Sequence, residues 1–156
     1  MRVSVVAITE VLGRADELPD GVRVTDVVQL DSDERLRGHQ RVRSRAGREL
    51  YLSLPRGSEL ADGDVLVVEG GAAIVVRAAD EDLLELVPRT AREWGLAAWG
   101  LGNLHRPARF GDGGILTPYD PAAEALARKL GVDCARVHRS FVGERLGAIT
   151  GHGHHH

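Results

Sequence analysis

The chain has 156 residues, a formal net charge of −3 and a single cysteine, Cys134. This length suits one compact domain or two small ones, and a hydrophobic content of 43% is enough to form a core. The negative charge argues against a general nucleic-acid binder, and a lone cysteine cannot form an intrachain disulfide, as is usual in a reducing compartment. No segment has the pattern of an export signal or a membrane span, so we expect a cytoplasmic protein.

The first half of the sequence alternates short apolar runs with turn signals, which is typical of β-structure. The run ELYLSL places Leu50, Leu52 and Leu54 on one face of a strand. The segment VLVVE, followed by Gly70-Gly71 and AAIVVRA, predicts a hairpin closed by a tight turn. Strands spaced by turns in this way indicate a small β-sandwich or a partly open barrel.

The second half of the sequence contains two helix signals. Thr90, with Glu93 three residues later, predicts the capped start of one helix. Asp120 and Pro121 predict the start of a second helix, and Gly131 predicts its end. With the extended segments around them, the order is β-α-β-β-α-β, which matches a ferredoxin-like arrangement.

Together these patterns predict an α+β protein in three parts. Residues 1–78 form an N-terminal all-β domain, a small sandwich or barrel. Residues 79–145 form the ferredoxin-like domain. Residues 146–156 are rich in glycine and histidine and are predicted to be a flexible tail.

No catalytic motif stands out, so we do not expect an enzyme. The sequence has no nucleophile elbow, P-loop or zinc-protease helix, and its carboxylates are scattered. The run QRVRSR places Arg41, Arg43 and Arg45 on one face of a strand. That face is either a docking surface for an acidic partner or a charged strand that discourages edge pairing, and we favour the second interpretation.

Histidines are the residues most suggestive of function. Four of the seven lie in the final GHGHHH: His152, His154, His155 and His156. A tract of imidazoles is typical of metal binding and suits Ni, Zn and Cu, with a cloning-tag remnant as the alternative. His105 follows the first predicted helix. A single imidazole holds a metal poorly, but a symmetric dimer would bring two copies of His105 together if they lay near the two-fold axis.

Several motifs, in order along the chain, resemble the urease accessory protein UreE family of nickel metallochaperones. LPRG occupies residues 54–57, GDVL occupies residues 63–66, and LGNLH occupies residues 101–105, where the family has LGNRH. A histidine-rich C-terminus follows. Each motif alone is a weak signal, but their order and spacing cover nearly the whole chain.

The resemblance implies a cytoplasmic homodimer that binds Ni²⁺ and supplies it to apo-urease, working with the urease GTPase and other accessory proteins. It implies that His105 contributes one ligand from each protomer at the dimer interface. The tail histidines would complete or feed that site. Zn²⁺ and Cu²⁺ are expected substitutes in vitro. The implied fold is a β domain over residues 1–78, similar to a peptide- or partner-binding domain, followed by a ferredoxin-like metal-binding domain.

Two departures from the family affect this interpretation. Leu104 replaces the family's arginine, and residues 116–120 lack the histidine pair that some members carry. We therefore expect few Ni²⁺ ions per dimer. Three alternatives stay open: a protein-binding module in which metal is secondary, a metal-dependent enzyme, and a histidine-rich metal buffer.

Overall fold

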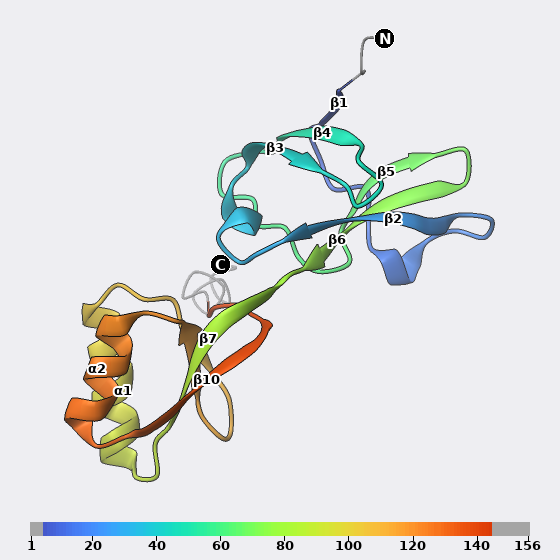
Figure 1. Ribbon diagram of the computed structural model, residues 1–156. Helices are drawn as coiled ribbons and strands as arrows, with labels where there is room; N and C mark the ends of the chain where they lie inside the picture. Colours follow the sequence, from blue (N-terminus) through green and yellow to red (C-terminus); the bar gives the residue numbers. More distant parts are fainter. Residues whose placement is uncertain (1–4, 145–156) are drawn as a thin grey trace, which may run out of the picture. The chain divides into compact units, whose positions relative to one another are not determined.

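The computed structural model describes residues 5–144 of the chain (Figure 1). Two compact units make up the chain, Met1–Ala79 and Asp80–His156. The predicted tail, 146–156, lies outside the described residues. Within residues 5–144, neither helix is long and apolar enough to cross a membrane.

The first unit contains two three-stranded sheets. One sheet has the order β1-β4-β3, with β1 parallel to β4 and β3 antiparallel to it; the strands are Val6–Ile8, Glu49–Ser53 and His39–Arg43. The other sheet has the order β2-β6-β5, with β2 parallel to β6; the strands are Arg23–Leu30, Ala72–Ala78 and Val65–Glu69. Two short 3-10 helices, η1 and η2, lie in the connections, at Ala15–Glu17 and Glu34–Leu36.

Apolar side chains from both sheets form one buried cluster, which confirms the predicted all-β domain. Its members are Ile8, Val28, Leu30, Leu50, Leu52, Leu54, Leu60, Leu66, Val67, Ile74 and Val76. The predicted alternation in β4 is present, because Leu50 and Leu52 are fully buried while Tyr51 is exposed. The β5–β6 hairpin turns at Gly70 and Gly71, whose φ angles of 56° and 79° are those a tight turn requires.

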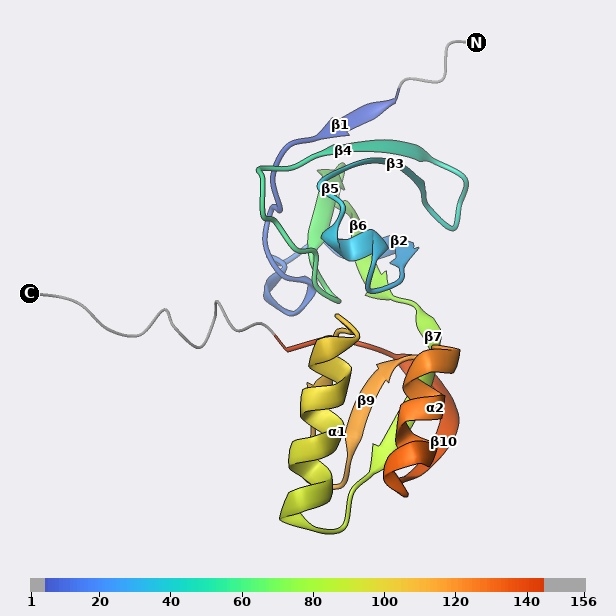
Figure 2. The same ribbon diagram turned by 90° about the vertical axis from the view of Figure 1, so that its left-hand side faces the viewer.

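The second unit has the predicted order of elements. These are β7 (Asp80–Val87), α1 (Ala91–Asn103), β8 (Arg109–Phe110), β9 (Ile115–Pro118), α2 (Pro121–Leu130) and β10 (Asp133–Ser140). The sheet order is β10-β7-β9-β8 and every pairing is antiparallel, which is the ferredoxin-like arrangement. Figure 2 shows α1 and α2 side by side on one face of this sheet. The core between helices and sheet consists of Leu84, Leu86, Ala97, Leu101, Ile115, Ala123, Ala127 and Val132.

Both helices begin where the sequence predicts, and α2 also ends at the predicted Gly131. The Thr90 hydroxyl accepts the N–H of Glu93 at 3.1 Å, and Asp120 accepts an N–H from the first turn of α2 at 2.6 Å. Gly131 ends α2 with a left-handed φ of 68°. The return half of the capping box differs from the standard form, because the Glu93 carboxylate accepts the N–H of Arg89 rather than that of Thr90.

Candidate metal centre

His105 lies immediately beyond α1, in a backbone conformation that usually belongs to glycine. Its φ is 54°, and it is the one non-glycine residue with positive φ among residues 5–144. Its N–H donates to the Gly102 carbonyl at 3.0 Å, and the N–H of Arg106 donates to the Leu101 carbonyl at 3.1 Å. These two bonds form a Schellman motif with His105 at its left-handed position. The exposed His105 imidazole therefore stands on a defined helix terminus rather than in a loose loop.

The residue after His105 is tied to the second helix. The guanidinium of Arg106 forms an ion pair with the carboxylate of Asp120, whose side chain is only 12% exposed. The same carboxylate caps α2. Asp120 thus joins the C-terminal end of α1 to the N-terminal end of α2. Some family members carry a histidine pair where this chain has residues 116–120. Because Asp120 already has these two partners, it is poorly suited to act as a metal ligand in place of that pair.

The next two residues are also tied to the rest of the unit. The carbonyl of Pro107 accepts a hydrogen bond from the fully buried Thr117 hydroxyl at 2.8 Å. The carbonyl of Ala108 accepts the N–H of Glu144 at 2.7 Å. Because Pro107 has no N–H and its carbonyl accepts a side-chain hydrogen bond, it cannot pair as part of a strand, and β8 begins only at Arg109. His105 is therefore followed by three residues with fixed partners.

An apolar groove lies between the exposed faces of α1 and α2, next to His105. It encloses about 420 Å³ and is lined mainly by apolar side chains, including Leu96, Trp99, Leu104, Leu126 and Leu130. Trp99 is 68% exposed and Leu104 is 37% exposed. Leu104, the residue that departs from the LGNRH pattern, thus extends an apolar surface on which large side chains already face water.

Within the described part of the chain, His105 does not belong to a cluster of potential metal ligands. Among residues 5–144, no three His, Cys, Asp or Glu side chains gather closely enough to hold a metal ion. The other predicted ligands, His152, His154, His155 and His156, lie outside the described residues. One copy of the described chain therefore offers a single exposed imidazole at this position.

Among residues 5–144, His39, His138 and Cys134 do not belong to a cluster of three or more potential metal ligands. His138 on β10 lies 3.2 Å from the Asp82 carboxylate, and both side chains are exposed. His39 is exposed on β3 in the other unit. Cys134 is half-buried and packs against the core of the ferredoxin-like unit. His39 and His138 are therefore surface groups, and Cys134 is part of the packing of its unit.

A polar cluster beside the α2 cap was not predicted from the sequence. The Arg136 guanidinium lies 3.9 Å above the ring of Tyr119, a cation–π contact. A hydrogen bond from the Tyr119 hydroxyl is the main reason that the pKa of Glu124 is lowered, and Arg128 adds to the effect. The same bond raises the pKa of Tyr119. The cluster joins the segment that carries Asp120 to both α2 and β10.

Sequence reasoning also missed the ion pair between Arg106 and Asp120. The two residues are far apart in the sequence, and neither has a local pattern that points to the other. The run Asp120-Pro121 does predict a helix cap, but that role alone does not indicate a second partner. Only the packing of α1 against α2 brings the two charges together.

Comparisons with known proteins match both units. The model of the N-terminal domain of the UreE urease accessory protein matches residues 8–79, and the model of its C-terminal domain matches residues 81–156. A urease accessory protein UreE from Deinococcus radiodurans is 41% identical over 124 residues, covering 80% of this chain and 79% of the relative. One from Geobacillus kaustophilus is 37% identical over 132 residues, covering 85% and 89%. One from a Synechococcus strain is 35% identical over 147 residues, covering 94% and 96%.

These matches span both units and extend over most of each relative's length. They agree with the α+β fold and with the motifs LPRG, GDVL and LGNLH in the sequence. They also point to an accessory protein rather than an enzyme. The chain belongs to the UreE family of urease accessory proteins.

Proposed function

We propose that the chain binds Ni²⁺ and delivers it to apo-urease, with His105 from two copies forming the fixed part of the metal site. Membership of the UreE family gives the chain a role in urease maturation. Nickel is the metal linked to urease assembly. To that role we add Ni²⁺ as the cargo, His105 as the fixed ligand and a homodimer as the assembly that holds the metal.

The backbone of His105 is the observation that carries the proposal. A left-handed conformation costs a residue with a Cβ about 1–2 kcal/mol, which glycine avoids at this helix position. Backbone strain of this kind clusters at functional sites, where the surrounding structure holds it in place. The exposed His105 ring and its costly backbone conformation together support a binding role for the imidazole.

The apolar groove beside His105 supports a homodimer. Trp99 and Leu104 are large apolar side chains that face water, and they lie on the same helix end as His105. A two-fold contact through this surface would bury both residues and bring the two His105 imidazoles close together. Leu104 would strengthen such a contact, because an apolar side chain needs no polar partner when it is buried.

Two imidazoles are too few to fill the coordination sphere of Ni²⁺, so we assign the additional ligands to the C-terminal histidines. His152 and His154 are the first choices, with His155 and His156 as further ligands. Zn²⁺ and Cu²⁺ should compete for the same nitrogen ligands, and Cu²⁺ is expected to bind at least as tightly as Ni²⁺. A ligand set assembled from separate segments can be removed one ligand at a time, which suits transfer to another protein.

The partners in this proposal are a second copy of the chain, the urease accessory GTPase and the apo-urease complex. A role in urease maturation requires contact with the urease assembly apparatus. We place the protein in the cytoplasm, where a single unpaired cysteine such as Cys134 is expected to stay reduced.

Urease activation in a reconstituted system tests the proposal. With Ni²⁺ limiting, His105→Ala should activate apo-urease several-fold more slowly than the unmodified protein, and excess Ni²⁺ should restore the rate. His39→Ala is the matched control, since His39 is an exposed histidine in the other unit. Equal activation by His105→Ala and His39→Ala at limiting Ni²⁺ would contradict the proposal.

A further inference from the structure

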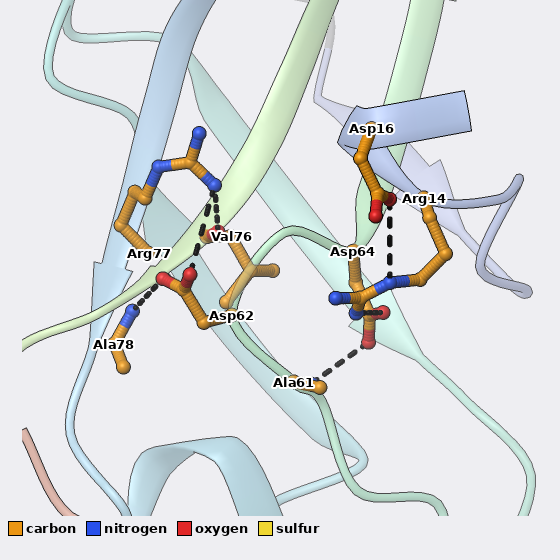
Figure 3. Close-up of polar contacts among 8 residues, drawn as sticks. All are labelled: Arg14, Asp16, Ala61, Asp62, Asp64, Val76, Arg77 and Ala78. Atoms are coloured by element: carbon orange, nitrogen blue, oxygen red, sulfur yellow. Dashed lines mark hydrogen bonds and ion pairs between the residues drawn. The ribbon is translucent and has the colours of Figure 1, made fainter. Parts of the chain in front are cut away.

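The first unit also contains a group of residues that plays no part in the proposed nickel site. A cavity of about 430 Å³ is bordered by the segment around η1, by β2, by the turn at residues 61–64 and by the end of β6. Two of its lining residues are Arg14 and Arg77 (Figure 3). Neither residue contributes to the proposed nickel site.

The two guanidiniums approach one another across Gly63. A Cβ placed on Gly63 would lie 3.2 Å from Nη2 of Arg14 and 3.8 Å from Nη1 of Arg77. Gly63 has a φ of 89°, a conformation that residues with a Cβ rarely adopt. The position between the arginines therefore has no side chain, and both guanidiniums border the same small open volume.

Arg14 is held firmly by its own neighbours. Its Nη1 donates to the Asp64 carboxylate at 2.8 Å, and the other oxygen of that carboxylate accepts the N–H of Ala61 at 2.8 Å. The Asp64 side chain is only 10% exposed. Figure 3 shows this arrangement, with Asp16 on the opposite side of the guanidinium. Arg14 is thus a fixed donor whose Nη2 faces Gly63.

Arg77 is only weakly engaged. Within the described part of the chain, the acceptors near its guanidinium are the Val76 carbonyl at 3.4 Å and the Asp62 carboxylate at 4.0 Å. Asp62 makes its better hydrogen bond elsewhere, with the N–H of Ala78 at 2.9 Å. A guanidinium carries five N–H donors, and the Arg77 side chain is 40% exposed. Most of the N–H groups of the Arg77 guanidinium are therefore available to a hydrogen-bond acceptor on a ligand.

A carboxylate is the ligand that fits this arrangement. Guanidinium groups bind carboxylates and phosphates through paired N–H donors. The carboxylates of Asp16, Asp62 and Asp64 lie beside the two arginines. They repel any anionic ligand, and they repel a dianionic phosphate more strongly than a monoanionic carboxylate. Ala15 and Val24 line the same cavity and offer apolar contacts for a methylene group next to the ligand's carboxylate.

We propose that Arg77 and Arg14 form a binding site for the carboxylate of a glutamate or aspartate side chain presented by a partner protein. Arg77 supplies most of the donors, and Arg14 supplies one fixed donor across Gly63. The site would let the first unit recognise an acidic segment independently of metal binding by the second unit.

Nuclear magnetic resonance titration of the full chain tests this site. The probes are the blocked peptide Gly-Glu-Gly, its neutral analogue Gly-Gln-Gly, and sodium acetate. We expect the glutamate peptide to shift the Gly63 amide and the Arg77 Nε–Hε resonances with saturation, and the glutamine peptide to leave both unchanged. Acetate should bind more weakly than the glutamate peptide, because it lacks the chain that contacts Ala15 and Val24.

Variants of Arg77 complete the test, because Arg14 also has a structural bond to Asp64. Arg77→Gln should weaken the glutamate peptide at least about tenfold, and Arg77→Lys should bind with intermediate affinity. Arg56→Gln, at an exposed arginine of the same unit, should leave the affinity unchanged. Equal shifts from both peptides, or unchanged affinity in Arg77→Gln, would overturn the site. Acetate binding as tightly as the glutamate peptide would overturn the assignment to a protein side chain.

Discussion

The guanidinium of Arg106 forms an ion pair with the carboxylate of Asp120, so the residue after His105 is bonded to the residue that caps α2. The contact fixes the end of α1 against the start of α2. It also fixes the direction in which the backbone leaves His105. We infer that it positions the His105 imidazole without touching the metal.

Replacing Asp120 by asparagine tests that positioning role. Asparagine caps helices about as well as aspartate, so α2 should be preserved while the ion pair is lost. We expect the affinity for Ni²⁺ to fall about fivefold, corresponding to an interaction of about 1 kcal/mol. Calorimetric titration measures the change.

Asp112→Asn is the control for this variant, since Asp112 is an exposed residue in the β8–β9 loop. Its Ni²⁺ affinity should equal that of the unmodified protein. Circular dichroism should show the same helix content in both variants. An unchanged affinity in Asp120→Asn, with helix content preserved, would rule out the positioning role.

The conformation of His105 predicts an unusual order of stabilities. His105→Gly should be more stable than His105→Ala by about 0.5–1 kcal/mol, because only glycine adopts a left-handed conformation without cost. Helix interiors show the reverse order. Urea denaturation of the two variants measures the difference in the free energy of unfolding. An alanine variant at least as stable as the glycine variant would mean that residue 105 does not keep its positive φ in solution.

Trp99 provides a test of the proposed dimer. Trp99→Asp places a charge on the apolar groove and should convert a dimer of the 16.8 kDa chain into a monomer. Since Trp99 is 68% exposed, the fold of the unit should be retained. Sedimentation velocity measures the assembly state. Leu36→Asp, at a 45% exposed leucine in the other unit, should remain dimeric. A dimer that persists in Trp99→Asp would exclude this surface as the interface.

The hydrogen bond between Tyr119 and Glu124 predicts a pH effect. It lowers the pKa of Glu124 in the folded state, so its stabilising effect is present above the usual pKa of a glutamate and is lost as the pH falls through the lowered value. Tyr119→Phe removes the bond and should raise the pKa of Glu124 toward its usual value. Titration of the Glu124 side-chain carboxyl by nuclear magnetic resonance detects the shift, and an unchanged pKa would mean that the bond is not formed in solution.

Local sequence signals predicted the elements that position the site. Thr90, Asp120 and Gly131 mark helix ends because each satisfies backbone groups of its own helix, which is a short-range effect. The alternation of Leu50 and Leu52 with Tyr51 identified a half-buried strand for a similar reason. The similarity of LGNLH to the family's LGNRH predicted a role for His105 itself.

The backbone conformation of His105 and the contacts around it could not be predicted from local sequence patterns. Glycine is the residue expected at a left-handed helix terminus, so a histidine there gives no signal for that conformation. The contacts of Arg106 with Asp120, and of Arg14 and Arg77 around Gly63, join residues from separate elements. Such contacts depend on how helices and strands pack, which a single sequence does not encode in any short pattern.

Native mass spectrometry, which counts bound Ni²⁺ and subunits together, tests whether His105 is the fixed metal ligand. The variants are the unmodified chain, a chain lacking residues 149–156, His105→Ala, and the combination of the last two. We expect the truncated protein to remain a dimer and to bind one Ni²⁺ with reduced affinity. We expect the combined variant to remain a dimer and to bind none. A combined variant that binds Ni²⁺ as well as the truncated protein does would contradict the assignment of His105 as the fixed ligand.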